Sequence, residues 1–236
     1  MSGPFTTAAP VIEQTEQVRS EFLVKVYQHL ALAVGLFVLL EWVLFTTGFA
    51  AWFSDLVFGG GRLGWGLVLG GFLIVTSMAS NAAKRLDNPG IQYLALFVAS
   101  AAYALIFAPL LYNYLRFEEG TTDVAIAAVM TGVGFAGLSL VALLTRKSLS
   151  FLRPIATWGS VLALIAIGGS LIFGFTLGLW FAVAMVGLMG VAILYKTQEI
   201  YRSYPAEAYV GAAVTLFSSL MTMFWYMIKI VSSLRN

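Results

Sequence analysis

Residues 154–195 read PIATWGSVLALIAIGGSLIFGFTLGLWFAVAMVGLMGVAILY, a run of 42 residues without Asp, Glu, Lys or Arg. One crossing of the hydrocarbon core of a bilayer takes about 20 predominantly apolar residues. The run is therefore long enough for two membrane helices joined by a tight turn. A soluble domain could neither bury so long an apolar run completely nor leave it exposed to water, so this stretch indicates a protein embedded in lipid.

The composition of the whole chain supports the same class. Hydrophobic residues make up 60% of the 236 residues and charged residues 10%, whereas soluble domains contain roughly 25% charged residues. The mean hydropathy is +0.91, and the net charge of +2 is too small to indicate nucleic-acid binding. The absence of cysteine excludes disulfides and thiol chemistry.

The charge-poor windows predict seven membrane helices. Strand-type alternation of apolar and polar residues is absent, which argues against a membrane β-barrel, and spans of this length in lipid are helices. The predicted class is an all-α membrane protein, a seven-transmembrane-helix bundle. The predicted spans are 23–48, 63–80, 91–115, 124–144, 154–173, 177–195 with up to a further turn, and 209–230.

The first 20 residues, MSGPFTTAAPVIEQTEQVRS, are polar and contain Glu13 and Glu16 ahead of Arg19. They lack the basic start and the apolar run of a secretory signal, and Ser2 stands where myristoylation requires glycine. We therefore expect residues 1–20 to form an exposed tail and residues 21–236 to form the transmembrane domain.

The distribution of basic residues predicts the orientation of the bundle. Cytoplasmic segments next to membrane helices carry an excess of Lys and Arg. Nine basic residues belong to the segments on the side of the N-terminus and four to the opposite side, which predicts a cytoplasmic N-terminus and a C-terminus outside. The nine are Arg19, Lys25, Lys84, Arg85, Arg146, Lys147, Arg153, Lys196 and Arg202, and the four are Arg62, Arg116, Lys229 and Arg235.

Two ionisable residues fall within the first span. A charged group at the centre of a bilayer costs roughly 2.5–3.5 kcal/mol on insertion scales, so each is a candidate functional residue. Glu41 is either a carboxylate that responds to protons or cations, or an interfacial acid near the outer leaflet. His29 could titrate near neutral pH, although a single histidine near an interface more often has a structural hydrogen-bonding role.

Polar residues also occur in the last two spans. Lys196 and Glu199 are three residues apart, a spacing that allows a solvated ion pair on one helix face or a gate at the mouth of the bundle. Ser218 and Thr222, together with Thr215 and Ser219, form a hydroxyl stripe along the seventh span. Such hydroxyls bond to neighbouring helices or to their own helix backbone, or they line a polar pathway.

Several chemistries are excluded by the residue inventory. The only histidine is His29, which leaves a serine–histidine protease without a suitable partner loop. One histidine and scattered acids do not provide a metal site, and no GxxxxGK[ST] phosphate loop occurs. Lys229 lies too near the end of its span to act as a retinal-type lysine. We therefore expect neither an enzyme nor a bound cofactor or metal.

Five stretches resemble the Bax inhibitor family of seven-helix membrane proteins, and within it the bacterial YccA-like branch. They are VYQHLALAVGLFVLL (26–40), APLLYNYL (108–115), LLTRKSLSFL (143–152), ILYKTQEI (193–200) and TLFSSLMTMFWYMIKI (215–230). The resemblance implies the seven-helix bundle of that family and a place in the bacterial inner membrane.

The resemblance also implies a functional position. Members of the family carry one carboxylate in the sixth helix and one in the seventh, proposed to share a proton and to gate a pH-sensitive calcium leak. The matching positions here are Lys196 and Ser219, and neither is an acid. A cation at the first position opposes the passage of calcium, and Glu199 follows one turn later.

The YccA-like branch implies a different role, association with the FtsH-type membrane protease as a slowly extracted substrate that modulates it. An exposed cytoplasmic tail and a bundle that resists extraction fit this role. We therefore expect a non-enzymatic modulator in membrane-protein quality control. The alternatives are a pH-sensitive calcium or ion leak channel and a stable accessory subunit of a larger membrane complex.

Overall fold

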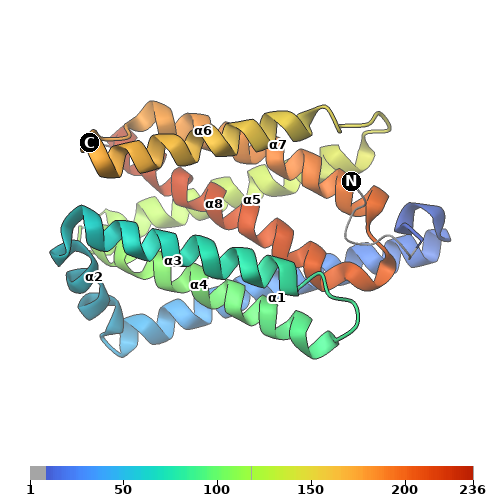
Figure 1. Ribbon diagram of the computed structural model, residues 1–236, viewed down its shortest axis with the longest axis horizontal. Helices are drawn as coiled ribbons and strands as arrows, with labels where there is room; N and C mark the ends of the chain where they lie inside the picture. Colours follow the sequence, from blue (N-terminus) through green and yellow to red (C-terminus); the bar gives the residue numbers. More distant parts are fainter. Residues whose placement is uncertain (1–8, 118, 236) are drawn as a thin grey trace.

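The computed structural model describes residues 9–117 and 119–235, and within these residues every regular element is a helix (Figure 1). Seven of the described helices are long and apolar enough to cross a membrane, as the sequence predicts, and an eighth is short. They are α1 (Glu16–Thr46), α2 (Phe49–Gly59), α3 (Gly61–Ala82), α4 (Pro89–Leu115), α5 (Gly120–Leu144), α6 (Leu152–Phe173), α7 (Leu179–Ser203) and α8 (Tyr209–Arg235), with 3-10 turns at Val11–Glu13 and Ala206–Ala208.

Local sequence signals set several helix ends. Thr15 caps α1, because its side chain accepts a hydrogen bond from the backbone N–H of Val18. Asn88 caps α4 in the same way, and Pro89 occupies the first helical position, where the missing N–H is harmless. Gly174 ends α6 with a φ of 78°, a left-handed conformation that glycine adopts without strain. The long uncharged run therefore folds into two crossings, as predicted.

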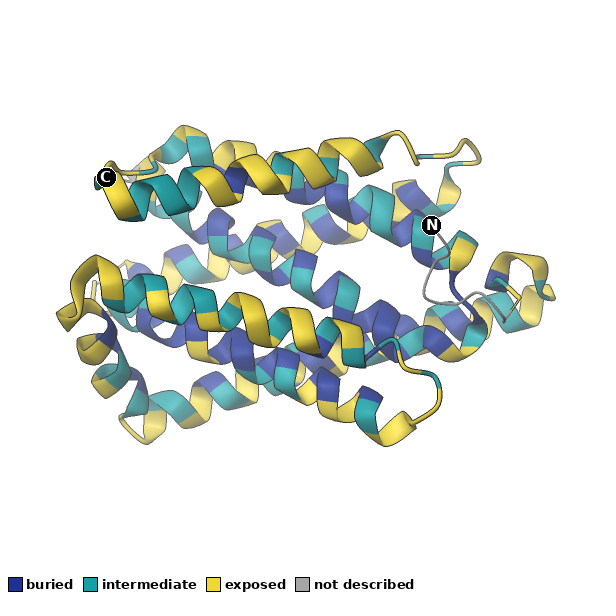
Figure 2. Ribbon diagram, in the orientation of Figure 1, coloured by how far each residue is buried: buried dark blue, intermediate teal, exposed yellow. Residues whose placement is uncertain are grey.

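The bundle has a packed centre and two peripheral helices, α3 and α6. α8 contacts α1, α3, α4, α5 and α7, and it runs diagonally through the middle of the molecule (Figure 1). In the most apolar window of α4, 67% of the residues are buried, compared with 6% in α3 and 6% in α6. Figure 2 shows the same contrast, with buried residues on α4 and α8 and mainly exposed or intermediate residues on α3 and α6. Most of the surface of α3 and α6 is thus available to lipid.

The short helix α2 was not predicted, because a window of 11 residues that includes Asp55 is too short to register as a span. It lies between α1 and α3 at the end of the bundle opposite the start of α1 (Figure 1). α2 packs against α4, where the side-chain amide of Asn113 donates a hydrogen bond of 2.9 Å to the hydroxyl of Ser54. Its other side exposes Trp52 and Leu56, an arrangement typical of a helix at the membrane interface.

The predicted N-terminal tail lies partly outside the described residues, which begin at residue 9. The described part packs against the bundle: Val11 is fully buried, and its backbone N–H donates a hydrogen bond of 2.8 Å to the carbonyl oxygen of Tyr204. α1 begins at Glu16, five residues before the predicted boundary at residue 21. The segment 9–15 is therefore attached to the loop between α7 and α8.

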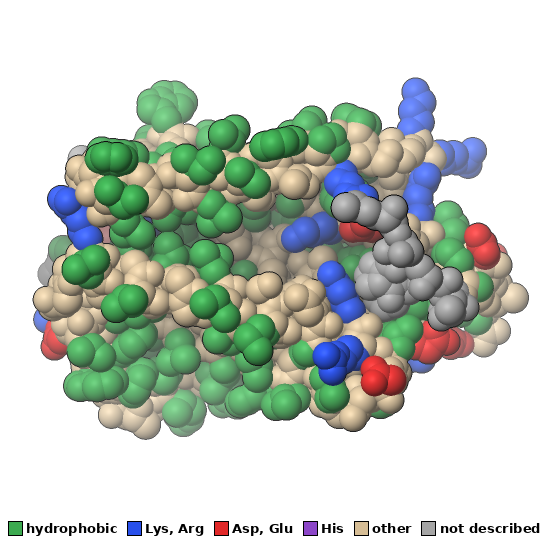
Figure 3. Space-filling model, viewed as in Figure 1, with side chains coloured by type: hydrophobic (Ala, Val, Ile, Leu, Met, Phe, Trp, Pro, Cys, Tyr) green, Lys and Arg blue, Asp and Glu red, His purple; other side chains and the backbone are tan. Residues whose placement is uncertain are grey.

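Basic side chains gather at the end of the bundle where α1 begins, and α8 ends at the opposite end (Figures 1 and 3). The loops at this end join α3 to α4, α5 to α6 and α7 to α8. We call it the basic end of the bundle.

Candidate functional site

Lys196 of α7 and Ser219 of α8 face each other within the bundle. The ammonium Nζ of Lys196 donates a hydrogen bond of 3.0 Å to Oγ of Ser219, and Ser219 is 2% exposed. Oγ of Ser219 in turn donates to the carbonyl oxygen of Thr215, at 3.3 Å. The two positions that match the family's acid pair are thus in direct contact, but they hold a cation and a hydroxyl.

The hydroxyl stripe of α8 bonds mainly to its own helix. Ser218 donates to the carbonyl of Val214 at 3.0 Å, and Thr222 donates to the carbonyl of Ser218 at 2.8 Å. The phenol of Tyr103, from α4, donates to the same Ser218 carbonyl at 3.0 Å and lies 3.4 Å from the Thr222 hydroxyl. These contacts tie α4 to α8, so the stripe serves both its own backbone and interhelical packing.

Tyr103 was not predicted as a site residue. In the sequence it is one aromatic residue among many in an apolar span, and nothing in its spacing indicates that its hydroxyl reaches α8. Its ring packs edge-on against Phe72 and Phe217. The ring belongs to the core, and only the oxygen belongs to the polar cluster.

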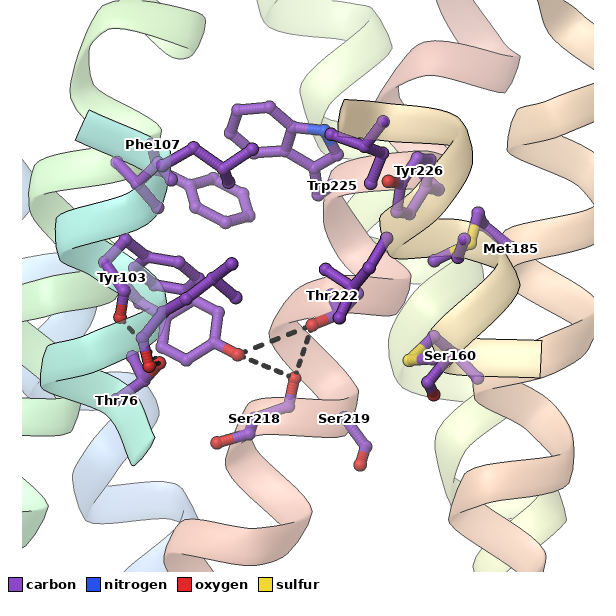
Figure 4. Close-up of a pocket in the computed structure, with 18 of the residues that line it drawn as sticks. Thr76, Tyr103, Phe107, Ser160, Met185, Ser218, Ser219, Thr222, Trp225 and Tyr226 are labelled. Carbon is purple, nitrogen blue, oxygen red and sulfur yellow. Dashed lines mark hydrogen bonds between the residues drawn. The ribbon is translucent and has the colours of Figure 1, made fainter. Parts of the chain in front are cut away.

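A cavity of about 330 Å³ adjoins this polar cluster. It lies between α3, α4, α6, α7 and α8, and Lys196, Ser218, Ser219 and Thr222 line it together with Tyr103. Figure 4 shows the hydroxyls of Thr222 and Tyr103 beside the backbone carbonyl oxygen of Ser218, with Phe107 and Trp225 at the other end of the cavity. We call this the Lys196 cavity.

Glu199 and Lys196, for which the spacing predicts a solvated ion pair or a gate, each have another hydrogen-bond partner. The Glu199 carboxylate accepts a hydrogen bond of 2.6 Å from the phenol of Tyr195, one turn earlier on α7. Lys196 instead turns toward α8 and Ser219. The spacing along α7 allowed the ion pair, but the partner on the neighbouring helix determines where the ammonium lies.

Glu41 lies away from the Lys196 cavity, near the end of α1. It is 7% exposed, so it is not an acid in contact with water at the interface. Neither carboxylate oxygen has a hydrogen-bond partner among the described residues. Glu41 lines a second cavity of about 400 Å³ between α1, α4, α5 and α8, which we call the Glu41 cavity.

Both ring nitrogens of His29 lie within hydrogen-bond distance of oxygen atoms of the protein. Its Nδ1 lies 2.7 Å from the carbonyl oxygen of Lys25 and its Nε2 lies 3.1 Å from the phenol oxygen of Tyr93. Its ring also packs against Tyr209. These contacts connect α1 to α4 and α8.

The surroundings of Ser219 differ from those of a serine–lysine hydrolase. A lysine bonded to a serine occurs in some hydrolases, but those enzymes also need donors that stabilise an oxyanion. Ser219 lies in the middle of α8, where backbone N–H groups are engaged within the helix. Among the described residues, no group of three His, Asp or Glu side chains could hold a metal ion.

A family model described as "Inhibitor of apoptosis-promoting Bax1" matches residues 19–236. The chain belongs to the Bax inhibitor family. Similar proteins occur in several bacteria. An uncharacterized protein of Neisseria meningitidis serogroup A is 27% identical over 180 residues, which are 76% of this chain and 77% of the relative. An uncharacterized protein of Pseudomonas aeruginosa is 30% identical over 148 residues, covering 62% of this chain and 66% of the relative.

A third similar protein, an uncharacterized membrane protein of Vibrio cholerae, is 24% identical over 152 residues, covering 64% of this chain and 66% of that relative. The match to the Bax inhibitor family begins near the start of α1 and includes every long helix. It confirms the resemblance found in the sequence and, with the seven apolar helices, makes this chain a multi-pass membrane protein of that family.

Proposed function

We propose that this Bax inhibitor family protein acts without catalysis, by associating with membrane proteins, and that it is a slowly extracted substrate and modulator of an FtsH-type membrane protease. The hydrogen bond between Lys196 and Ser219 is the main reason to propose association with other proteins and not conduction of calcium. Ca²⁺ is bound by carboxylate and carbonyl oxygens, whereas here an ammonium occupies the position of a family carboxylate. An ammonium repels a divalent cation in a site of low dielectric constant.

The N-terminal segment supports the slow extraction. A protease that pulls from the N-terminus must first separate Val11 from Tyr204 and then withdraw α1. α1 packs against α4 and α8, the two most buried spans. Each step exposes buried apolar surface or leaves a backbone group without its partner, so the bundle resists the pull.

We place the protein in a bacterial inner membrane, with the N-terminus in the cytoplasm. The basic end of the bundle supports this orientation, and the relatives named above are bacterial. An FtsH-type protease takes hold of its substrates on the cytoplasmic side, where the N-terminal segment would lie. A reporter enzyme that is active only outside the cytoplasm, fused after residue 236, should be active.

The test follows the degradation of a second FtsH substrate in cells that overproduce this protein. Removing residues 2–9 shortens the segment ahead of Val11 without cutting α1, and we expect the second substrate to be degraded at its normal rate again. A variant that replaces residues 2–9 with Gly and Ser at equal length is the control, and it should still slow degradation. If the shortened protein inhibits as strongly as the full chain, the proposal fails.

A cation leak is the second candidate, and Glu41 is the observation that favours it. A buried carboxylate whose oxygens lack partners among the described residues and that faces a cavity is the kind of group that binds protons or cations. Purified protein in liposomes, assayed for calcium and proton flux over a series of pH values, tests this candidate. Flux that Glu41→Gln abolishes would favour the leak over association.

A further inference from the structure

The Lys196 cavity combines one polar end with apolar walls. Lys196, Ser219 and the hydroxyl cluster of α8 form the polar end. Leu69, Phe72, Leu164, Ile167 and Met185 contribute apolar wall, and Trp225 lies at the far end. A volume of about 330 Å³ is at the lower end of the range of roughly 300–1,000 Å³ for small-molecule sites. The shape and chemistry are those of a site for one small amphiphile.

The cavity is reached from the side of the bundle. α3 and α6 supply two of its walls, and these two helices bury 6% of their most apolar windows. Figure 3 shows a hollow between them on the face of the molecule, with basic side chains at the end of the hollow near the basic end of the bundle. Because the outer faces of α3 and α6 are apolar and exposed, they contact lipid in a membrane. A molecule that enters between them comes from the bilayer.

The charge around the polar end is positive. An ammonium has three N–H donors, and the hydrogen bond that Lys196 makes within the described residues goes to the neutral hydroxyl of Ser219. Lys84 adds a second positive charge near Lys196 and Glu199 adds one negative charge, so the three groups together are net positive. The Glu199 carboxylate accepts its hydrogen bond from Tyr195, and the ammonium of Lys196 donates to Ser219. Lys196 is half-buried, and a charge that is partly withdrawn from water is costly unless it is paired. An anionic group at the cavity end would provide the missing pair.

We propose that the Lys196 cavity binds a single-chain fatty acid from the bilayer, with its carboxylate on Lys196 and its chain along the apolar wall toward Trp225. The size of the cavity favours one acyl chain over a two-chain phospholipid. The carboxylate accepts hydrogen bonds from the N–H groups of Lys196 that do not bond to Ser219. The acyl chain exchanges its contacts with lipid for contacts with Phe72 and Met185. This site is independent of the protease partnership proposed above.

The test uses the protein in nanodiscs of phosphatidylcholine, titrated with 9,10-dibromostearate. Bromine quenches tryptophan fluorescence on contact. The part of the quenching that is absent from Trp225→Phe therefore reports on ligand in the cavity. We expect this part to reach a plateau as the concentration of the brominated acid rises, as it does when a ligand fills a site. Lys196→Met should weaken binding at least about tenfold, because it removes the charged partner, whereas Lys196→Arg should retain it. Lys147→Met, which changes an exposed lysine that does not line the cavity, is the control and should bind as the unmodified chain does.

Two further ligands separate the sources of the signal. The uncharged alcohol of the same brominated chain should bind at least about tenfold more weakly than the acid. Brominated phosphatidylglycerol in the disc should not produce saturable quenching of Trp225. Equal binding of acid and alcohol, equal binding by Lys196→Met, or saturable binding of phosphatidylglycerol in place of the acid would each overturn the proposal.

Ala163→Phe provides a second test that leaves Lys196 in place. Ala163 lines the cavity from α6, and a phenyl ring at this position would fill part of it. Thermal melting followed by circular dichroism establishes that each variant is folded. A folded Ala163→Phe protein that binds the acid with unchanged affinity would place the acid elsewhere and contradict the proposal.

Discussion

The Lys196 cavity and the Glu41 cavity are each lined by a residue with an ionisable group in a membrane helix, and the two groups differ in their hydrogen-bond partners. Lys196 lies toward the basic end of the bundle and bonds to a hydroxyl, whereas Glu41 lies toward the opposite end and has no hydrogen-bond partner among the described residues. Within the described chain the two cavities share no lining residue, and different faces of α8 contribute to each. The acid and the base are therefore separated by the central helix, and neither cavity contains the pair of carboxylates that the resemblance associates with a calcium leak.

The largest effect should come from rebuilding that pair. The double variant Lys196→Asp with Ser219→Asp places two carboxylates in contact, and two acids at that distance share a proton and provide calcium ligands. We expect calcium efflux from liposomes to rise by at least about tenfold, a difference of about 1.4 kcal/mol in barrier height. Each single variant should remain near the efflux of the unmodified chain. A double variant that stays impermeable would show that these positions do not control conduction in this bundle.

A double-mutant cycle measures the contact between Lys196 and Ser219. Ser219→Ala removes the one hydrogen-bond acceptor described for the half-buried ammonium of Lys196. We expect a loss of about 1–3 kcal/mol in the free energy of unfolding, because a polar group withdrawn from water loses its partner. Lys196→Met in the same chain should cancel most of that loss, because the unpaired charge is gone. Additive effects, measured by unfolding in detergent, would mean that the two side chains are not coupled.

Replacing Glu41 should raise the free energy of unfolding, whereas replacing Ser219 should lower it. Glu41→Met replaces a buried carboxyl that has no described partner with an apolar side chain of similar length, so the protein should gain about 1 kcal/mol in stability. Glu21→Met removes an exposed carboxylate from the same helix and should change stability by less than about 0.5 kcal/mol. A clear loss of stability in Glu41→Met would indicate a partner for the carboxylate outside the described residues.

The smallest effect is expected when the protein is treated with a reagent that labels catalytic serines, because we propose that it has no catalytic activity. A fluorophosphonate reacts with serines that a neighbouring base has activated. Ser219 is 2% exposed and lies within a regular helix, so we expect no covalent adduct at this residue by mass spectrometry. A stoichiometric adduct on Ser219, absent from Lys196→Met, would instead indicate a serine–lysine hydrolase.

The fold could be predicted from the sequence because each span has its own physical signature. A helix that crosses a bilayer must satisfy its backbone internally and expose apolar side chains, and this requirement is visible in windows such as 154–195 without knowledge of neighbouring helices. Helix α2 was missed because a short interfacial helix is stabilised by packing against α4, through contacts such as that between Ser54 and Asn113. Its existence therefore depends on tertiary structure.

The candidate site could be predicted only in part. The resemblance located Lys196 and Ser219 by their place in ILYKTQEI and TLFSSLMTMFWYMIKI, and they are in contact. The sequence could not show that Glu199 bonds to Tyr195, that Tyr103 reaches α8, or that Glu41 is buried. Each of these three features depends on which helix packs against which face of another. Because the helices are apolar on all sides, the hydrophobic pattern of the sequence does not specify which helices are neighbours.

Calcium efflux from liposomes that contain the unmodified chain tests the central claim most directly. The double variant with two aspartates serves as the positive control, and protein-free liposomes serve as the baseline. With a lysine at position 196 and a serine at position 219, neither side chain supplies a carboxylate for calcium, and efflux should stay at the baseline at acidic, neutral and alkaline pH. Efflux above the baseline that changes with pH would show that this bundle conducts calcium without the acid pair, and it would contradict the account.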